Sequence, residues 1–304
     1  LDDRSERSHG GALRIERTRV EETVMRKAKN FDLRGAVQVL QQEADAVDAP
    51  ADVETRMKKA REKFPEKLKM PVSFESDIGH VSRFTQDNLA EVLRRTRRTA
   101  APAIDGWSKG LVGPTVRDYP AIGDLWCGLL TKVLCGEFSP LVMRCLRAAR
   151  LVAIPKSDGG VRPIAVSHFF LKLAGAMSLS VGKERCAEWQ YAVGGVKGTR
   201  HIVHRLREHR DRGHTVFKFD LKNAYNEIPR GVCERSLESA SSALRQYFRT
   251  VYSGPSDMVC FSRAGVHVIE SVEGVRQGDA TSSFVFCRAM DVVMKEILDE
   301  VMRT

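Results

Sequence analysis

The stretch from His214 to Arg230 most constrains what this chain can fold into. It opens with a run of β-branched and aromatic residues that ends on one carboxylate, Asp220. This pattern predicts a buried strand over 215–220. A carboxylate at the end of a buried strand is costly unless a cation meets it, and Mg²⁺ takes hard oxygen ligands that it shares with substrate phosphates. Taken alone, the same acid equally fits a turn or a helix cap.

The charge of the chain favours a polyanionic partner. Its 304 residues include 49 Lys and Arg against 39 Asp and Glu, which gives a net charge of +10. Such a surplus is typical of proteins that bind nucleic acid, although a merely soluble basic protein shows the same balance. The 42% hydrophobic content supports a real core, and the length allows one large or two ordinary domains.

The cysteines and the hydropathy pattern indicate a reducing location and no membrane partner. Seven cysteines are scattered without a C-x-x-C pair, which argues against a disulfide framework and against a structural zinc site. We therefore expect the nucleus or the cytoplasm. No apolar run reaches the roughly 18 residues needed to cross a bilayer. No secretory signal is recognisable at the start of the sequence.

Hydrophobic periodicity predicts an α+β fold and not a regular βαβ alternation. We expect a basic, helical N-terminal part, and Thr85 is predicted to cap the helix that follows it. The predicted helices span 13–47 (one long helix or a helical pair), 52–63, 85–99, 115–136, 139–148, 168–189, 231–253 and 279–303. The predicted strands span 149–154, 161–166, 215–220, 257–263 and 266–272.

Two further segments carry candidate chemistry. The first, LVAIPKSDGGVRPIAV at 151–166, is a predicted hairpin that places Lys156 and Arg162 near its tip. Triphosphate binding needs cations on a rigid support, and Lys and Arg supply a point charge and a planar fork. A basic surface hairpin without a ligand fits the same pattern.

The second segment, GVRQGDATSSFVFC at 274–287, contains two glycines that flank Gln277. Glycines at such a junction let the backbone approach a ligand closely, and the amide of Gln277 suits a base or a sugar. The simplest interpretation of Asp279 is an ordinary N-cap for the helix that follows.

Five segments in a fixed order together resemble the reverse transcriptases, and most closely those of non-LTR retrotransposons. APAIDGW (101–107) and IPK…VRPIAV are similar to the first two finger motifs, and QYAVGGVKGTRHIVHRL (190–206) is similar to the third. FDLKNAYNEI (219–228) resembles motif A, and GVRQGDATSSFVF (274–286) resembles motif B. The resemblance implies a right-hand polymerase fold, in which a helical N-terminal extension (1–84) precedes fingers (85–215) and a partial palm (216–304).

The resemblance also implies an activity and the residues that perform it. The reaction is RNA-directed DNA polymerisation with Mg²⁺ or Mn²⁺, on an RNA template, a DNA primer and dNTPs. Asp220 would be the catalytic metal ligand, with the Leu221 carbonyl beside it, and Tyr225 would exclude a 2′-hydroxyl. The nucleotide site would further include Lys156, Arg162, Gln277 and Gly278. Contacts to nucleic acid would come from Lys197, Arg200, His201 and Arg205.

The chain departs from the family pattern in three places. Motif C, an aromatic residue followed by an Asp-Asp pair, is absent after motif B, so we expect this polypeptide to lack polymerase activity by itself. Asn226 stands where many relatives have Asp, and Ser283 stands where Pro is usual. A catalytically inactive RNA-binding scaffold, or a decayed retroelement copy that kept the fold, is the alternative. Within the polymerase class, a relative of group II intron maturases or of telomerase also stays open.

Overall fold

The computed structural model describes residues 50–70, 79–96, 104–156, 158–191, 193, 198–262 and 265–303, together with Glu22 and Met25. Two compact units divide the chain, Leu1–Thr55 and Arg56–Thr304. Of the predicted helix or helical pair at 13–47, only Glu22 and Met25 are described, and both are helical. The first residues of APAIDGW, 101–103, lie outside the described residues.

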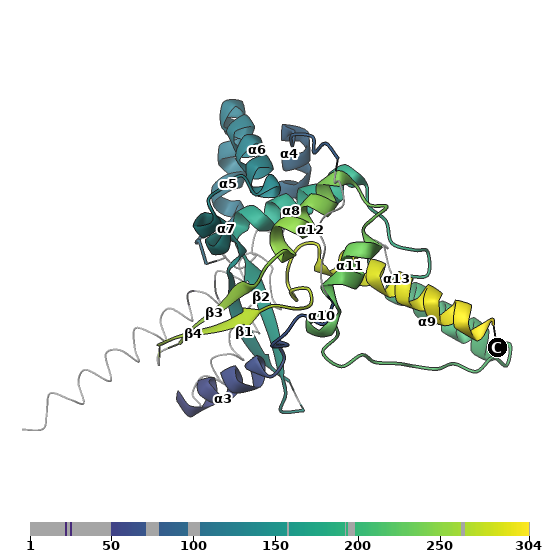
Figure 1. The fold of residues 1–304 in the computed structure, drawn as a ribbon. Coiled ribbons are helices and arrows are strands. Elements are labelled where there is room, and N and C mark those ends of the chain that lie inside the picture. Colours follow the sequence, from purple (N-terminus) through teal and green to yellow (C-terminus); the bar gives the residue numbers. More distant parts are fainter. Residues whose placement is uncertain are drawn as a thin grey trace, which may run out of the picture. The chain divides into compact units, whose positions relative to one another are not determined.

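A four-stranded sheet in the order β2-β1-β3-β4 forms the β part of the second unit (Figure 1). The strands are β1 (Ala149–Pro155), β2 (Val161–Ser167), β3 (Ser256–Ser262) and β4 (Gly265–Ser271). The sheet consists of two antiparallel hairpins, and β1 and β3 join them in parallel through the Ala149–Met258 and Arg150–Val259 registers. Both hairpins were predicted from short strand patterns joined by turn residues, and both are confirmed.

Helices form the rest of the unit, and α8 (Phe169–Gly182) lies at their centre. It packs against α4 (Gln86–Arg95), α6 (Pro120–Cys135) and α12 (Ser242–Tyr252), while α11 (Arg230–Ser236) packs against α13 (Ser282–Val301). The remaining helices of this unit among the described residues are α5 (Lys109–Asp118), α7 (Pro140–Arg147), α9 (Gly198–Asp211) and α10 (Ala224–Glu227), and the boundary between the two units falls within α3 (Pro50–Arg61). The core at this helix junction includes Leu89, Leu130, Leu171, Met177 and Leu244, all fully buried. The mixture confirms the α+β class.

Local sequence explains where several helices begin and end. Thr85 caps α4 as predicted, because its side chain accepts from the Asn88 amide and the Asn88 side chain accepts from the Thr85 amide. The helix predicted over 115–136 is instead two helices that meet at Tyr119 and Pro120, where proline starts the second one. The helix predicted over 168–189 ends at Gly182. The helix predicted over 231–253 is likewise divided, into α11 and α12.

The strand predicted over 215–220 is wrong. This segment runs as an extended loop from α9 to α10 (Figure 1), and Phe217 and Phe219 are 75% and 85% exposed. A strand is stable only when a neighbour satisfies its backbone groups. Among the described residues, no other strand pairs with this segment.

No single described helix is long and apolar enough to cross a membrane. Helices α6 and α7, which meet at 97°, reach the required length and composition only as a bent pair.

Candidate active site

The loop between β4 and α13 packs directly against the backbone of two other segments of the chain. Its two glycines adopt left-handed conformations, with φ values of 71° at Gly274 and 112° at Gly278. A Cβ atom on Gly274 would lie 2.4 Å from the carbonyl oxygen of Asn226, and one on Gly278 would lie 2.6 Å from that of Ala165. Both positions therefore require glycine, for conformation and for space.

Hydrogen bonds fix the same two contacts. The Val275 amide donates to the carbonyl oxygen of Tyr225 at 2.8 Å, and the Ala165 amide donates to that of Gln277 at 2.8 Å. This loop, residues 272–281, is called the motif B loop below. It joins the short helix α10 on one side to strand β2 on the other. This junction brings Tyr225 and Gln277, which are 52 positions apart in the sequence (277 − 225), to one place.

Tyr225 lies half-buried against the start of α13. Its ring stacks on Phe286 with the ring centroids 5.0 Å apart, and its hydroxyl donates to Ser283 Oγ at 3.1 Å. Ser283 is the residue that stands where the resembled family usually has Pro. Helix α13 still begins at Ser282, so the departure leaves the helix start in place. The serine instead supplies a hydrogen-bond partner for the tyrosine.

Asp279 is a buried acceptor, and its predicted role as the N-cap of the last helix is wrong. The N-cap of α13 is Thr281, whose amide and hydroxyl donate to Asp279 Oδ1 at 3.0 and 2.9 Å. The Tyr247 hydroxyl donates to Asp279 Oδ2 at 2.8 Å. Burial, reinforced by the Asp279 charge, raises the pKa of Tyr247 well above its ordinary value. The carboxylate therefore ties the loop to α12.

Lys156 and Arg162 lie together at the tip of the β1–β2 hairpin. Both side chains are exposed, and they line an open pocket of about 330 Å³ with Ile154, Pro155 and Asp158. Strand β2 connects this pocket to the motif B loop, because a Cβ on Gly278 would lie 3.2 Å from Ile164 Cγ2. Alternate residues of a strand share a face, so Arg162 is on the same face of β2 as Ile164.

Asp220 is exposed in the loop that leads into α10. Within the described part of the chain it makes no hydrogen bond or ion pair, and no three His, Cys, Asp or Glu side chains form a group that could hold a metal ion. Its carboxylate and the neighbouring Leu221 carbonyl have the donor chemistry that Mg²⁺ prefers, and the side chain is not engaged elsewhere. These two oxygens fit part of a metal site.

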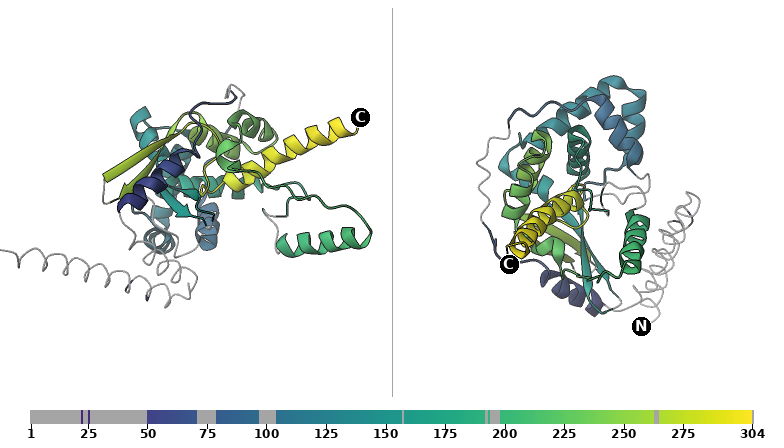
Figure 2. Two further views of the ribbon diagram at one scale, coloured as in Figure 1. Left: turned by 90° about the horizontal axis from the view of Figure 1, so that it is seen from below. Right: turned by 90° about the vertical axis from the view of Figure 1, so that its right-hand side faces the viewer.

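The predicted nucleic-acid contacts fall on or next to α9, whose side chains are almost all exposed. Figure 2 shows an extended segment that leads from the end of this helix back to the rest of the unit. The His201 ring stacks on Tyr191 with centroids 6.3 Å apart, and a hydrogen bond to Tyr191 raises the pKa of Arg205. Arg200 lies on the same helix, whereas Lys197 is outside the described residues.

Two buried residues that were given no role in the predicted site, Arg230 and Glu273, form hydrogen bonds with the loop of this junction. Arg230 is 1% exposed, and its guanidinium donates to four backbone carbonyls, those of Tyr252, Gly254, Ser271 and Gly274. Burial, followed by the charge of Arg276, lowers its pKa to about 10. Glu273, also 1% exposed, accepts from the Arg230 amide at 2.8 Å. In a chain with 49 Lys and Arg, one arginine after Pro229 does not indicate from the sequence that its guanidinium is buried against four backbone carbonyls.

Comparison with known proteins gives this geometry a family. Residues 154–303 match the family model described as reverse transcriptase (RNA-dependent DNA polymerase). The chain is also similar to the retrotransposable element SLACS 132 kDa protein of Trypanosoma brucei gambiense, with 28% identity over 219 residues. That match covers 68% of this chain and 18% of the relative, so the chain spans less than a fifth of the relative's length. The family match includes the β4–α13 segment that carries the junction, and the two matches together support a reverse transcriptase domain of the retrotransposon kind in this chain.

Proposed function

We propose that this domain positions a dNTP and a primer on an RNA template for RNA-directed DNA synthesis, in a right-hand polymerase architecture. Residues 85–215 would be the fingers and 216–304 part of the palm, after an N-terminal extension at 1–84. The observation that carries the proposal is the backbone junction that joins Tyr225, the Gln277 loop and strand β2. Three segments that each suit one part of a nucleotide meet there.

Each part of the nucleotide would have its own partner. Lys156 and Arg162 would hold the triphosphate, since their pocket at the hairpin tip presents two cations and one acid, Asp158. The exposed edge of Gly278 gives a base or a sugar access to the backbone, and Gln277 would donate or accept beside it. Tyr225, fixed by Phe286 and Ser283, would present its ring edge to the sugar.

Asp220 and the Leu221 carbonyl would hold a divalent cation, Mg²⁺ or Mn²⁺. Such an ion, when bound, supplies positive charge to the phosphates and lowers the pKa of a coordinated hydroxyl. The protein's own part in the reaction is to orient the primer end, the sugar and the triphosphate, because phosphoryl transfer depends mainly on positioning and charge. We further propose that catalysis needs carboxylates beyond those that the described residues place near Asp220.

The sugar-gate role of Tyr225 predicts a change in nucleotide selectivity. In an active polypeptide that contains this chain, Tyr225→Ala is expected to raise the ratio of rNTP to dNTP incorporation by about tenfold or more, because about 1.4 kcal/mol of discrimination corresponds to a factor of ten. Single-nucleotide primer extension with each substrate measures the ratio. Tyr225→Phe keeps the ring and loses only the bond to Ser283, so it should retain most of the selectivity.

Tyr119→Ala is the matched control, because Tyr119 is 61% exposed at the junction of α5 and α6. A selectivity ratio for Tyr225→Ala that equals the control ratio would refute the gate.

The template-binding role of α9 predicts a change in salt dependence that this chain can show without turnover. Arg205→Ala is expected to weaken binding to every RNA sequence by a similar factor. It should also reduce the slope of log affinity against log salt by about one, which is the contribution of one phosphate contact. Arg200→Ala should do the same. Fluorescence anisotropy with a labelled RNA across a salt series measures both slopes.

Arg117→Ala removes an equally exposed arginine that already pairs with Asp118, and it should leave the slope unchanged. Equal slopes for all three variants would exclude α9 as a phosphate contact. The alternative, a non-catalytic RNA-binding scaffold, predicts the same salt effect but no selectivity effect of Tyr225.

A further inference from the structure

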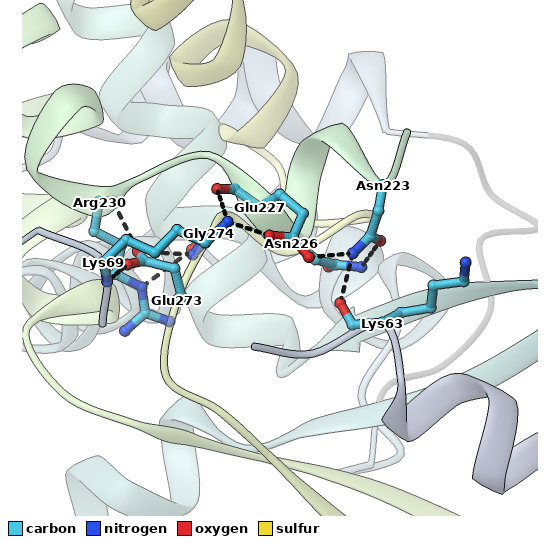
Figure 3. A network of polar contacts seen from close by, with 8 residues as sticks. All are labelled: Lys63, Lys69, Asn223, Asn226, Glu227, Arg230, Glu273 and Gly274. Carbon is cyan, nitrogen blue, oxygen red and sulfur yellow. Dashed lines mark hydrogen bonds and ion pairs between the residues drawn. The ribbon is translucent and has the colours of Figure 1, made fainter. Parts of the chain in front are cut away.

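The segment between α3 and Met70 contacts both ends of the turn 223–227, which carries Tyr225 (Figure 3). At the start of the turn, Asn223 Nδ2 donates to the Lys63 carbonyl oxygen at 2.8 Å. At the end of the turn, Lys69 Nζ forms an ion pair with the Glu227 carboxylate and donates to the Glu227 carbonyl oxygen at 3.3 Å. We call residues 62–70 the strap.

The strap is also bonded to the loop on which the turn rests. Glu273 is 1% exposed, and its two carboxylate oxygens accept hydrogen bonds from different backbone amides. Oε1 accepts from the amides of Arg230 at 2.8 Å and Gly274 at 3.1 Å, and Oε2 accepts from the Lys69 amide at 2.5 Å. A buried carboxylate needs such donors to offset its desolvation. Glu273 therefore fixes the strap, the start of α11 and the motif B loop to one another.

The turn itself has weak internal support. Helix α10 has only four residues, and its N-cap, Asn223, is a non-glycine residue with a φ of 56° and no side-chain capping bond to the helix. The Asn223 side chain is held instead by Lys63, by Glu227 at 3.0 Å and by Asn226 at 2.8 Å. A left-handed Asn at a short helix persists when its surroundings over-determine it. The strap supplies one of these three restraints, through Lys63, and it holds the Glu227 side chain through Lys69.

We infer that Lys69 and Glu273 are positioning residues, through which the strap and the motif B loop together hold the Tyr225 turn in place. The motif B loop restrains the turn through the Val275 amide and Gly274, and the strap restrains it through Asn223 and Glu227. Only the functional meaning of Tyr225 rests on the proposed polymerase function. The contacts between the strap and the turn do not depend on that function.

The test is amide hydrogen exchange on the full chain, read peptide by peptide. Lys69→Met removes the ion pair with Glu227 and keeps the length of the side chain. We expect exchange of the amides in 223–228 to become about tenfold faster, since local opening governs exchange and one of the ties across the turn is lost. Exchange over the β1–β2 hairpin, 149–167, should stay unchanged.

Two variants serve as controls. Lys67→Met changes an exposed lysine of the same strap for which the structure gives no bond within its described part, and it should leave exchange as in the unmodified chain. Lys69→Arg keeps a cation that reaches Glu227, and it should restore slow exchange in 223–228. Rescue by arginine identifies the charge contact, because a general loss of packing would not be repaired by a bulkier side chain.

Unchanged exchange over 223–228 in Lys69→Met would overturn the inference. So would an equal increase over 223–228 and 149–167, because that pattern signals global destabilisation. The measurement does not use primer extension. If Tyr225→Ala leaves nucleotide selectivity unchanged, the hydrogen-exchange result therefore still holds. If Lys69→Met leaves hydrogen exchange unchanged, the selectivity result still holds.

Discussion

Replacing Gly274 with alanine is expected to lower the free energy of unfolding by about 2–5 kcal/mol. A left-handed conformation costs an alanine about 1–2 kcal/mol, and overpacking a tight site costs about 1–3 kcal/mol. The steric part is large here because the new methyl group would meet the backbone of Asn226 at 2.4 Å, and Asn226 is buried. Backbone atoms cannot rotate away as a flexible side chain would.

The loop has little freedom to accommodate the methyl group by moving. The carbonyl oxygen of Gly274 accepts from Arg230 Nε at 3.1 Å, and its amide donates to Glu273 at 3.1 Å. Any shift therefore breaks bonds to a buried guanidinium and a buried carboxylate, and unpaired buried polar groups cost about 1–3 kcal/mol each. Thermal or denaturant unfolding measures the change, at about 2–4 °C for each kcal/mol in a domain of this size.

Gly213→Ala is the matched control for the conformational part. Gly213 has a φ of 78°, and a Cβ there would meet nothing within 4 Å among the described residues. The difference between the two variants isolates the contact with Asn226. Equal losses at Gly274 and Gly213 would mean that the motif B loop does not press against the Tyr225 turn, and the junction would lose its structural basis.

Sequence patterns predicted the elements whose stability depends on local residues. In the β1–β2 and β3–β4 hairpins, a short connection joins two antiparallel strands that are neighbours in the sequence. Thr85 has a polar side chain that caps α4, and Asn88 lies three residues after it. Pairing within each hairpin needs no information from distant segments. The motif order also identified the family correctly, because five short patterns in sequence constrain one another.

The errors concern features that depend on distant partners. The run before Asp220 has the composition of a strand, but composition cannot supply the neighbour that a strand needs. Asp279 sits where an N-cap is expected, yet its position is decided by Tyr247, which lies 32 residues away. Arg230 and Glu273 were given no role in the predicted site. Their importance arises from burial among carbonyls and amides that the fold alone brings together.

Replacing Asp220 with alanine is expected to reduce primer extension by about a thousandfold or more in an active polypeptide that contains this chain. Loss of a direct cation ligand removes several kcal/mol of charge stabilisation, and each 1.36 kcal/mol changes a rate tenfold. Asp220 fits this role because its carboxylate is exposed and precedes the Tyr225 turn by only five residues. Steady-state extension rates on an RNA template with saturating Mg²⁺ measure the effect.

The design of this experiment must separate the role of Asp220 from a general loss of acidic surface. Asp211→Ala is the matched control, since Asp211 is an exposed acid at the end of α9 that pairs with Arg210. It should leave extension within about twofold, because surface ion pairs contribute little. Asp220→Ala should also leave the denaturant midpoint unchanged, because the described residues give this side chain no partner to lose. Full extension activity in Asp220→Ala would remove this residue from the proposed metal site. It would also leave the proposed metal site without a ligand side chain, since the described residues form no group of three His, Cys, Asp or Glu side chains that could hold a metal ion.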